Sequence, residues 1–294
     1  MDILSIFRTF QTQEQCLDYL EQVRWRGEPV CPYCSSKRVG RHTSPDRANQ
    51  RWQCRECTRA FSVTVGTIFH RTHVPLQKWF LLLGLMLSAK RCASSHQIAR
   101  DLGIRQPTVW SMMHRARVAM ANDQEQERLL HGIVEADETY IDGKPRKANR
   151  RDDDLKAQPG QGREEAVVLG AIECDGRVAA APAASAKGRA VPTYLPCVFD
   201  RAGTLLVTDE WSYNQVSREV NHASTNHNVQ YVDGLVQTNT IESFWSLLKR
   251  AWYGSHHRYS RRSIGLYVSV GCYKYNRRRV KDGFPHVFGL MVGA

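Results

Sequence analysis

The chain has 294 residues, of which 42% are hydrophobic and 24% charged, a composition that allows a folded core and excludes a fully disordered polymer. Its formal net charge is +12, divided unevenly along the chain. Residues 1–131 carry 19 basic and 11 acidic side chains (+8), residues 132–242 carry 12 and 17 (−5), and residues 243–294 carry 10 and 1 (+9). Two basic flanks predict a polyanionic partner, and an acidic centre is where divalent cations could be held.

The first residues and the apolar runs of the chain argue against a membrane or secreted protein. The segment from Met1 to Arg8 lacks a basic region followed by a long apolar stretch, so no secretory signal is expected. The longest apolar run, residues 79–87, is about half the length of a bilayer span. We therefore expect a cytoplasmic protein with no membrane partner.

Four cysteines form two Cys-x-x-Cys pairs, Cys31 with Cys34 and Cys54 with Cys57, with nineteen residues between the pairs. This spacing predicts that the four thiolates bind one structural Zn²⁺ in a tetrahedral site. Alternating sequence on either side of the second pair, at 50–53 and 61–65, predicts short strands. We therefore expect a zinc ribbon over residues 15–65.

A zinc ribbon either binds DNA or only stabilises a fold whose core is small. The arginines around the second cysteine pair favour DNA contact, with Arg51 and Arg55 as the main candidates. The others nearby are Arg38, Arg41, Arg47 and Arg59.

Residues 75–125 are predicted to be a helical DNA-binding segment. Pro75 stands where a helix over 76–90 would begin. Ser94 would then cap a short helix that ends at Gly103, and Pro107 would open a second helix. Two helices joined in this way are typical of a helix-turn-helix, although an αα-hairpin that only packs has the same pattern. If the segment is a helix-turn-helix, four side chains of the second helix would face a major groove: Gln106, Thr108, Ser111 and Arg115.

From residue 130 to 280 the pattern predicts an α/β domain. A strand over 132–141 carries Asp137, and the polar stretch 142–165 is expected to be a loop or insertion. A hairpin from 166 to 179 turns at Asp175 and Gly176, and a later strand at 204–208 ends at Asp209. A helix begins near Asn239. Strands, a hairpin, a further strand and a helix, with an acid on three of these elements, follow the order of an RNase H-like domain.

The acids of this domain are suited to two hard divalent cations, Mg²⁺ or Mn²⁺, because such ions take oxygen ligands from several elements. Asp137 would bridge the ions and Asp209 would bind one of them. On a helix, Glu242 and Lys249 lie about 20° apart around the axis. The Glu242 carboxylate could therefore bind a metal ion while the Lys249 ammonium beside it contacts DNA. Asn239 lies about 80° from Lys249 but could reach the same site. The alternative is that each acid is only a turn former, a cap or a solvated side chain.

Basic and aromatic side chains that follow this site are expected to hold DNA. Phosphate contacts are predicted for Lys249, Arg250, Arg258, Arg261, Arg262, Lys274, Arg277, Arg278 and Arg279. Stacking on unpaired bases is predicted for Trp245, Trp252, Tyr253 and Tyr259.

Four segments resemble a known family: VEADETYI at 134–141, TDEW at 208–211, TNTIESFWSLLKR at 238–250 and YNRR at 275–278. Together with the cysteine pairs they resemble the bacterial insertion-sequence transposases of the ISXO-like branch, which join a zinc ribbon and a helix-turn-helix to a DDE-type catalytic domain of RNase H-like fold. The resemblance spans roughly residues 15–280. It implies that Asp137 and Asp209 are catalytic.

The third catalytic position stays open between two residues. The family pattern has Asn in place of the usual Glu and favours Asn239, whereas metal chemistry and the helical relation to Lys249 favour Glu242. The family also implies binding to terminal inverted repeats, metal-dependent cleavage and strand transfer into target DNA. Because joining two DNA ends needs two active sites, we expect a homodimer or higher homo-oligomer on DNA. The alternative function is a non-catalytic zinc-ribbon DNA-binding regulator derived from a decayed transposase.

Overall fold

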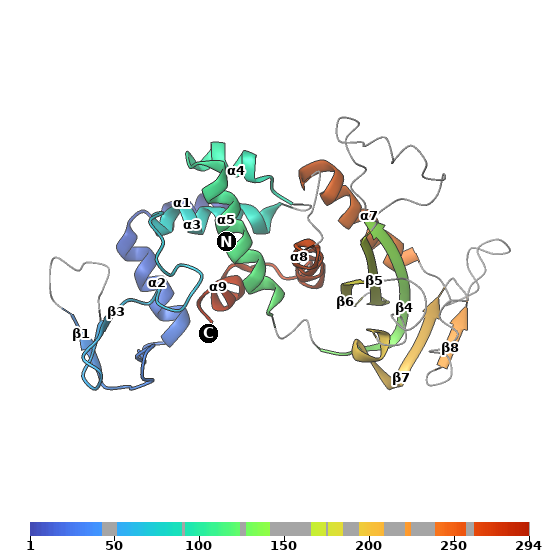
Figure 1. Cartoon of the computed structure of the whole chain (residues 1–294), viewed down its shortest axis with the longest axis horizontal. Helices are drawn as coiled ribbons and strands as arrows, with labels where there is room; N and C mark the ends of the chain where they lie inside the picture. The colour runs from blue at the N-terminus through green and yellow to red at the C-terminus, as the bar shows by residue number, and fades with distance from the viewer. Residues whose placement is uncertain are drawn as a thin grey trace, which may run out of the picture. The chain divides into compact units, whose positions relative to one another are not determined.

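The computed structural model describes residues 1–42, 52–89, 92–123, 128–141, 166–174, 176–184, 194–208, 221–224, 239–256 and 262–293 (Figure 1). The chain forms two compact units. The first consists of Met1–Asn122 and Val280–Ala294, and the second consists of Asp123–Arg279. The two ends of the chain therefore belong to the same unit.

The first unit is mainly helical. Its helices are α1 (Ile3–Thr9), α2 (Gln13–Trp25), α3 (Leu76–Ser88), α4 (Ser95–Leu102), α5 (Gln106–Ala121) and α9 (Phe284–Val292). As the sequence predicts, Ser94 caps α4 through the amide of His96, and Gly103 ends α4 in the left-handed conformation that glycine tolerates best. Pro107 lies in the first turn of α5. No helix among the described residues is both long and apolar enough to cross a membrane.

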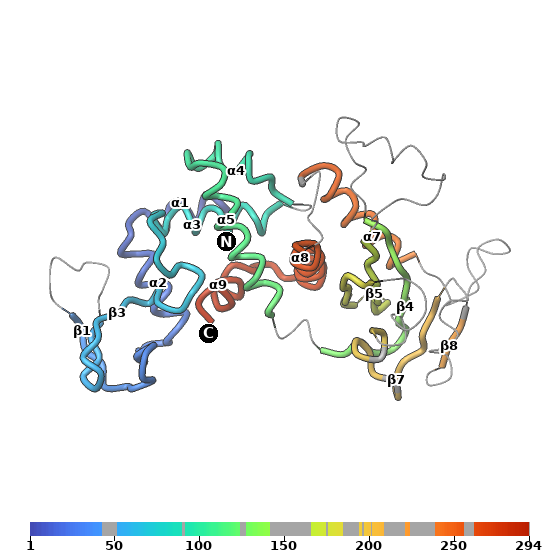
Figure 2. The backbone as a smooth tube through the Cα atoms, in the orientation of Figure 1, coloured from blue at the N-terminus to red at the C-terminus, as the bar shows by residue number. Residues whose placement is uncertain are grey.

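The C-terminal helix α9 is part of the core of the first unit. It packs against α2 and α5, as Figure 2 shows for the red end of the chain. Its Phe288 ring lies 4.4 Å from that of Phe80 and 5.5 Å from that of Tyr19, centroid to centroid. Helix α9, which lies beyond the predicted catalytic domain, thus completes a hydrophobic core built by the N-terminal helices.

The ribbon is a small antiparallel sheet with strands β1 (Val39–Arg41), β2 (Trp52–Cys54) and β3 (Ala60–Phe61), in that order. The strand predicted to run to Val65 ends at Phe61, because the chain turns when the Val65 amide bonds to the Ser62 carbonyl. Helix α2 holds this sheet: Glu21 accepts a 2.9 Å bond from the indole of Trp52 and forms a 3.2 Å ion pair with Arg41.

The second unit contains a mixed five-stranded sheet. Its strands are β4 (Leu130–Ile141), β5 (Ala166–Glu173), β6 (Val178–Ala183), β7 (Phe199–Thr208) and β8 (Asn221–Ser224). The spatial order is β6-β5-β4-β7-β8. The pairs β4–β5 and β5–β6 are antiparallel, whereas β4–β7 and β7–β8 are parallel. The longest strand, β4, is therefore central, with an antiparallel meander on one side and parallel strands on the other.

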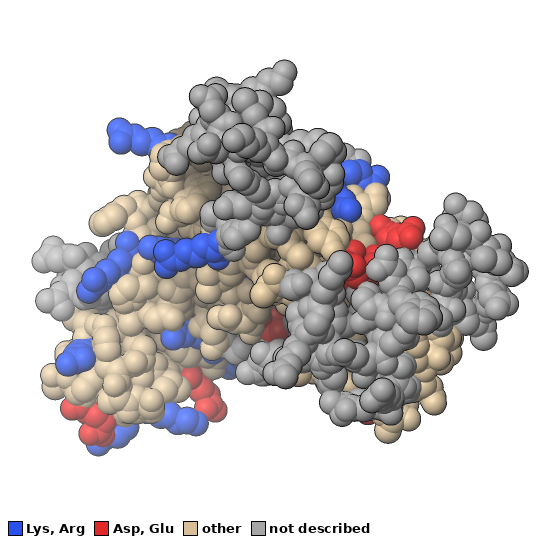
Figure 3. Space-filling view, turned by 45° about the vertical axis from the view of Figure 1, so that its right-hand side comes forward, with Lys and Arg blue, Asp and Glu red and all other residues tan. Residues whose placement is uncertain are grey.

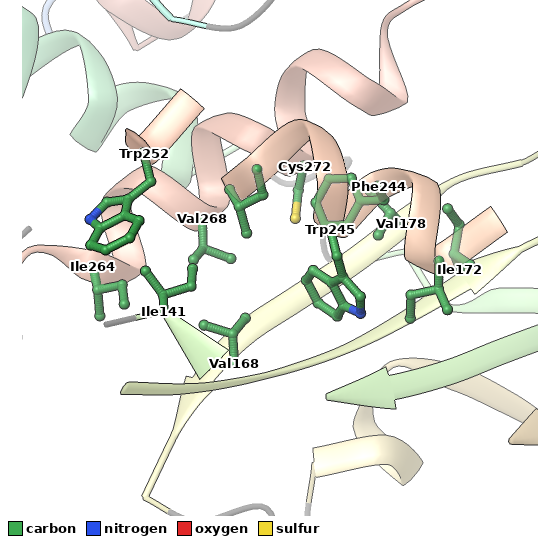
Figure 4. Close-up of a cluster of buried hydrophobic side chains, with 12 residues drawn as sticks. Ile141, Val168, Ile172, Val178, Phe244, Trp245, Trp252, Ile264, Val268 and Cys272 are labelled. Atoms are coloured by element: carbon green, nitrogen blue, oxygen red, sulfur yellow. The ribbon is translucent and has the colours of Figure 1, made fainter. Parts of the chain in front are cut away.

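Helices α7 (Asn239–Ala251) and α8 (Ile264–Asn276) pack on one face of this sheet. The π-helical turn η7 (Trp252–His256) extends α7. The buried side chains between α7, α8 and the sheet, here called the α7 core, are shown in Figure 4. They include Val168, Ile172, Phe244, Trp245, Trp252 and Val268. A separate cluster with Val134, Ala136, Leu195 and Phe199 occupies the opposite face, where the short 3₁₀ helix η5 (Leu195–Cys197) lies.

Candidate active site on the central strand

Strand β4 turns an apolar side and a polar side to the two faces of the sheet. Val134 and Ala136 belong to the buried cluster that includes Leu195. Because side chains alternate along a strand, Glu135 and Asp137 point to the other face, where α7 lies. Both carboxylates bond to α7, which confirms this orientation. Two acids thus lie on one face of the central strand, directly under the helix that carries Asn239 and Glu242.

Glu135 joins β4 to the first turn of α7. Its side chain is buried, and Oε2 accepts hydrogen bonds from the amides of Thr240 at 2.9 Å and Ile241 at 2.8 Å. The first amides of a helix have no intrahelical acceptor, so the carboxylate acts as a cap provided by a distant strand. Burial raises the pKa of Glu135, a shift that the bonds from α7 oppose and the nearby charge of Glu242 increases. Sequence reasoning assigned this residue no role.

Asp137 is held by two N–H donors. The indole Nε1 of Trp245 donates to Oδ2 at 2.9 Å, and the amide of Glu138 donates to Oδ1 at 2.7 Å. Asp137 remains half-buried, whereas Trp245 is only 4% exposed. An ionised carboxylate offers about four acceptor positions, so two such bonds are compatible with cation binding as well.

Gly170 of β5 makes room for Trp245. It pairs with Asp137 across the antiparallel strands β4 and β5. A Cβ on Gly170 would lie 2.5 Å from Cη2 and 2.7 Å from Cζ2 of the Trp245 ring, closer than carbon atoms can approach. Figure 4 shows the indole directed from α7 towards the sheet, in the region of Val168 and Ile172. Only glycine at position 170 allows the ring to reach Asp137 in this way.

Helix α7 brings other candidate residues near this point. At about 100° per residue, Glu242 lies about 60° and Lys249 about 40° from Trp245 around the helix axis, whereas Asn239 lies about 120° away. Glu242 is exposed, and Lys249 is half-buried. The edge of α7 that contacts Asp137 is therefore the edge that carries Glu242 and Lys249.

The second predicted acid, Asp209, lies outside the described residues. Strand β7 ends at Thr208, the residue before it, and Val207 pairs with Glu135 in the parallel register. The buried Thr208 hydroxyl lies 2.9 Å from Nε2 of His222 on β8. Desolvation lowers the pKa of His222. Strand β7 thus ends beside the stretch of β4 that leads to Asp137.

The four paired cysteines converge on one point. Their sulfur atoms all lie within 4.8 Å of one another, and the Sγ–Sγ distances are 3.6 Å for Cys31 with Cys57 and for Cys34 with Cys54. A tetrahedral zinc with Zn–S bonds of about 2.3 Å places its sulfurs roughly 3.8 Å apart, so the donors fit this ion, and the sulfurs are too far apart for disulfides. Among the described residues, these cysteines are the one group of three or more His, Cys, Asp or Glu side chains close enough to share a metal.

The electrostatics of the cysteine cluster favour a thiolate at Cys54. The backbone amide of Cys57 is the largest of the influences that lower the pKa of Cys54 to about 6. At Cys34 the backbone hydrogen bond from Ser36 lowers the pKa, but desolvation and bonds to the other three thiols outweigh it and raise the pKa to about 12. A metal ion would replace these shared protons and bind all four sulfurs as thiolates.

Two protein-family models match segments of this chain. Residues 129–276, just over half of the chain, match the model of the ISXO2-like transposase domain. The chain belongs to the ISXO2-like transposase family. Residues 11–60 of this ISXO2-like protein match the transposase zinc-ribbon domain, which agrees with the ribbon and its four cysteines.

Individual proteins similar to the ISXO2-like protein have low sequence identity to it. An uncharacterized protein in the transposable element ISH50 of Halobacterium salinarum is 27% identical over an aligned length of 274, and the alignment covers 89% of this chain and 90% of that protein. A chain in the crystal structure of a pre-cleavage Mos1 transpososome aligns with 73% of this chain and 78% of its own length, at 13% identity. Its TM-score of 0.23 is too low to bear on the fold.

Several arginines proposed as DNA contacts in the ISXO2-like protein also bond within the chain. Arg115 donates to the carbonyls of Ile68 at 3.1 Å and His70 at 3.3 Å. Arg277 pairs with Asp123 at 3.5 Å, and Arg278 donates to the carbonyl of Gly176 at 2.9 Å. Figure 3 shows the Lys and Arg side chains of one face as separate groups, with acidic side chains between some of them. Replacing one of these arginines would therefore remove bonds within the chain as well as any contact with DNA.

Other predicted contacts differ in their exposure. Arg55, Ser111, Arg250, Arg262 and Arg278 are exposed, and Gln106, Thr108, Lys249 and Arg277 are half-buried. Arg51, Arg258 and Arg261 lie outside the described residues.

The prediction that Trp245 and Trp252 stack on bases is wrong. These side chains are 4% and 5% exposed, because α7 and the adjoining turn η7 direct them into the α7 core. The neighbouring Tyr253 is 67% exposed and remains a candidate.

Proposed function

We propose that this ISXO2-like protein is a DNA transposase that binds the terminal inverted repeats of its element, cleaves the DNA and joins the freed 3′ ends to target DNA. The observation that carries the proposal is the bond from Trp245 to Asp137. It connects a half-buried acid on the central strand with the edge of α7 that bears Glu242 and Lys249. Such a combination of carboxylates and a cation is suited to metal-dependent phosphoryl transfer.

The sheet supports an RNase H-like interpretation of the catalytic domain. Its strand order is β6-β5-β4-β7-β8. The first three strands along the chain, β4, β5 and β6, form an antiparallel meander, and β7 and β8 run parallel to β4. This arrangement agrees with the order of elements expected for that fold. In the RNase H-like order expected from the sequence, the first strand carries an acid, which here is Asp137 on β4.

We propose Asp137 and Asp209 as the first two catalytic acids. Val207 pairs with Glu135 in the parallel register, and in the sequence Asp209 and Asp137 each follow two residues after that pair. Two Mg²⁺ or Mn²⁺ ions held by such acids would activate the attacking oxygen and stabilise the leaving oxygen.

Glu242 is favoured over Asn239 as the third acid. It lies on the side of α7 that contacts Asp137, and its charge acts on Glu135. A carboxylate is also a better ligand for Mg²⁺ than an amide. Lys249, about 20° from Glu242 around the helix, would hold a phosphate of the reacting strand.

The first unit would find the element ends. The zinc ribbon, with Arg55, and helix α5, with Gln106, Thr108 and Ser111, would bind double-stranded DNA as a ribbon and a helix-turn-helix. The half-buried Lys249 and the exposed Arg250, Arg262 and Arg278 would contribute phosphate contacts in the second unit. Since joining two ends requires two active sites, we propose a homodimer or higher homo-oligomer on DNA.

The test is a strand-transfer assay with the element's own terminal repeats and Mg²⁺. Wild type should give joined products, and Asp137→Ala and Asp209→Ala should abolish them without loss of DNA binding. Glu242→Ala should abolish transfer, whereas Asn239→Ala should retain it. Activity that survives both aspartate changes would refute the site. Repeat binding by wild type without any metal-dependent chemistry would instead identify a non-catalytic regulator.

A further inference from the structure

We propose that Trp245 is a positioning residue whose indole N–H orients the Asp137 carboxylate for divalent cation binding. The inference rests on the proposed function, because it concerns the same metal site. It adds a residue that contacts neither DNA nor metal and acts only through Asp137.

The geometry of the bond supports this role. The indole nitrogen lies 2.9 Å from Oδ2 of Asp137. The ring is closely packed in the α7 core, and its centroid lies 5.2 Å from that of Phe244. A side chain enclosed in this way cannot rotate to another partner without opening the core. The donor is therefore fixed before any ion arrives, and the carboxylate must adapt to it.

The contact between Trp245 and Asp137 requires a glycine at position 170. The ring occupies the space that a Cβ at position 170 would need. Because Gly170 pairs with Asp137, the free space lies beside the acid itself. Glycine lowers the stability of a strand, so its presence within β5 is explained by the close approach of the indole.

The chemistry of indole suits the task. Its N–H is a donor only and carries no charge. An Arg or Lys in this place would orient the carboxylate equally well, but its positive charge would oppose cation binding. A hydroxyl could rotate and accept as well as donate. Trp245 orients Asp137 while leaving the negative charge that attracts the metal.

The bond also relates two proposed ligands to each other. Trp245 and Glu242 are three residues apart on α7, about 60° around its axis. Holding Asp137 to Trp245 therefore fixes the distance between β4 and the side of α7 that carries Glu242. Outer hydrogen bonds of this kind typically change metal affinity by about 10–100-fold when they are lost.

The experiment compares Trp245→Phe with Trp252→Phe. Phe at position 245 retains most of the ring volume but lacks the N–H. The control removes an indole from the adjoining turn η7 and from the same α7 core, but it leaves the donor to Asp137 in place. Mn²⁺ binding to the full-length zinc-loaded protein is measured by the electron paramagnetic resonance of free Mn²⁺, with circular dichroism to verify folding.

We expect Trp245→Phe to weaken Mn²⁺ binding by about 10–100-fold and Trp252→Phe to change it by less than about threefold. In wild type, the tryptophan fluorescence should change with the same Mn²⁺ midpoint, and the change should be lost in Asp137→Asn. Equal Mn²⁺ affinity of a folded Trp245→Phe and wild type would overturn the inference while leaving the proposed function intact. Absence of Mn²⁺ binding by wild type would overturn both.

A further variant guards against a general loss of packing. Gly170→Ala keeps the indole donor but occupies its space, so it should also weaken Mn²⁺ binding. If Gly170→Ala and Trp245→Phe both fold and both bind Mn²⁺ like wild type, the indole has no orienting role.

Discussion

The carboxylate of Glu135 accepts a 2.8 Å hydrogen bond from the amide of Ile241, a residue 106 positions later in the chain. A buried acid on the central strand thus fixes the start of the helix that carries the candidate ligands Asn239 and Glu242. The same strand contacts the next turns of α7 through Asp137 and Trp245. Helix α7 is therefore attached to β4 at two points, with Glu242 between them in sequence.

Removing the Glu135 carboxylate should destabilise the second unit. Glu135→Ala leaves two helix amides without an acceptor, one buried and one part-buried, at a cost of about 2–4 kcal/mol in the free energy of unfolding. Glu135→Gln retains a carbonyl acceptor and should cost about 1 kcal/mol. Urea denaturation followed by circular dichroism measures both. Equal losses in the two variants would mean that the hydrogen bonds to α7 are not what stabilises this contact.

The same residue should produce a defined pH dependence. Burial raises the pKa of Glu135 above its usual value of 4.5. When the pKa of an acid is higher in the folded state than in the unfolded state, its protonation stabilises the fold. The stabilisation is complete at a pH below the unfolded-state pKa and is lost as the pH rises through the folded-state pKa. The free energy of unfolding of wild type should therefore fall relative to Glu135→Gln as pH rises from below 4.5. A constant difference between acid and neutral pH would contradict this.

The C-terminal helix should be essential to the first unit. Phe288 is fully buried among Phe80, Tyr19 and Phe284, so Phe288→Ala should lower the free energy of unfolding by about 3–5 kcal/mol. Phe7→Ala on α1 is the matched control, since Phe7 is 62% exposed and should change stability by less than about 0.5 kcal/mol. Thermal or urea unfolding distinguishes the two. Similar behaviour of both variants would show that α9 does not complete this core.

Loss of zinc should unfold the ribbon selectively. Chelation, or Cys31→Ser, should release one Zn²⁺ per chain and expose the ribbon to proteolysis, because the metal contributes most of the stability of such a small fold. The second unit has its own core and should keep its structure. Metal analysis with limited proteolysis and mass spectrometry tests this. A ribbon that resists proteolysis after complete zinc removal would contradict it.

The exposed side of α5 offers a test of the helix-turn-helix hypothesis. Ser111→Glu places a negative charge on an exposed position of the proposed recognition helix and should weaken repeat binding at least tenfold without a change in thermal stability. Leu4→Glu, at a 66% exposed position on α1 of the same unit, is the control for a surface charge. Fluorescence anisotropy with repeat DNA measures the affinities. Unchanged affinity in Ser111→Glu would favour a hairpin that only packs.

The sequence alone determined the features that depend on near neighbours. Two Cys-x-x-Cys pairs predict a zinc site because the ligand geometry needs only a short spacer. Ser94, Gly103 and Pro107 predict the limits of α4 and the start of α5, since caps act within a few residues. The strand over 132–141 and the hairpin after it follow from periodicity and turn residues.

Tertiary structure decided the relationships between residues that are distant in the chain. Neither the cap from Glu135 nor the bond from Trp245 to Asp137, 108 residues apart, leaves a local pattern, because each depends on how α7 packs on β4. Trp245 and Trp252 resemble DNA-stacking residues in the sequence, but packing of α7 and η7 in the α7 core buries them. The return of α9 to the N-terminal helices is likewise a property of packing. Short-range preferences fix single elements, whereas burial and long-range hydrogen bonds select which elements and acids meet.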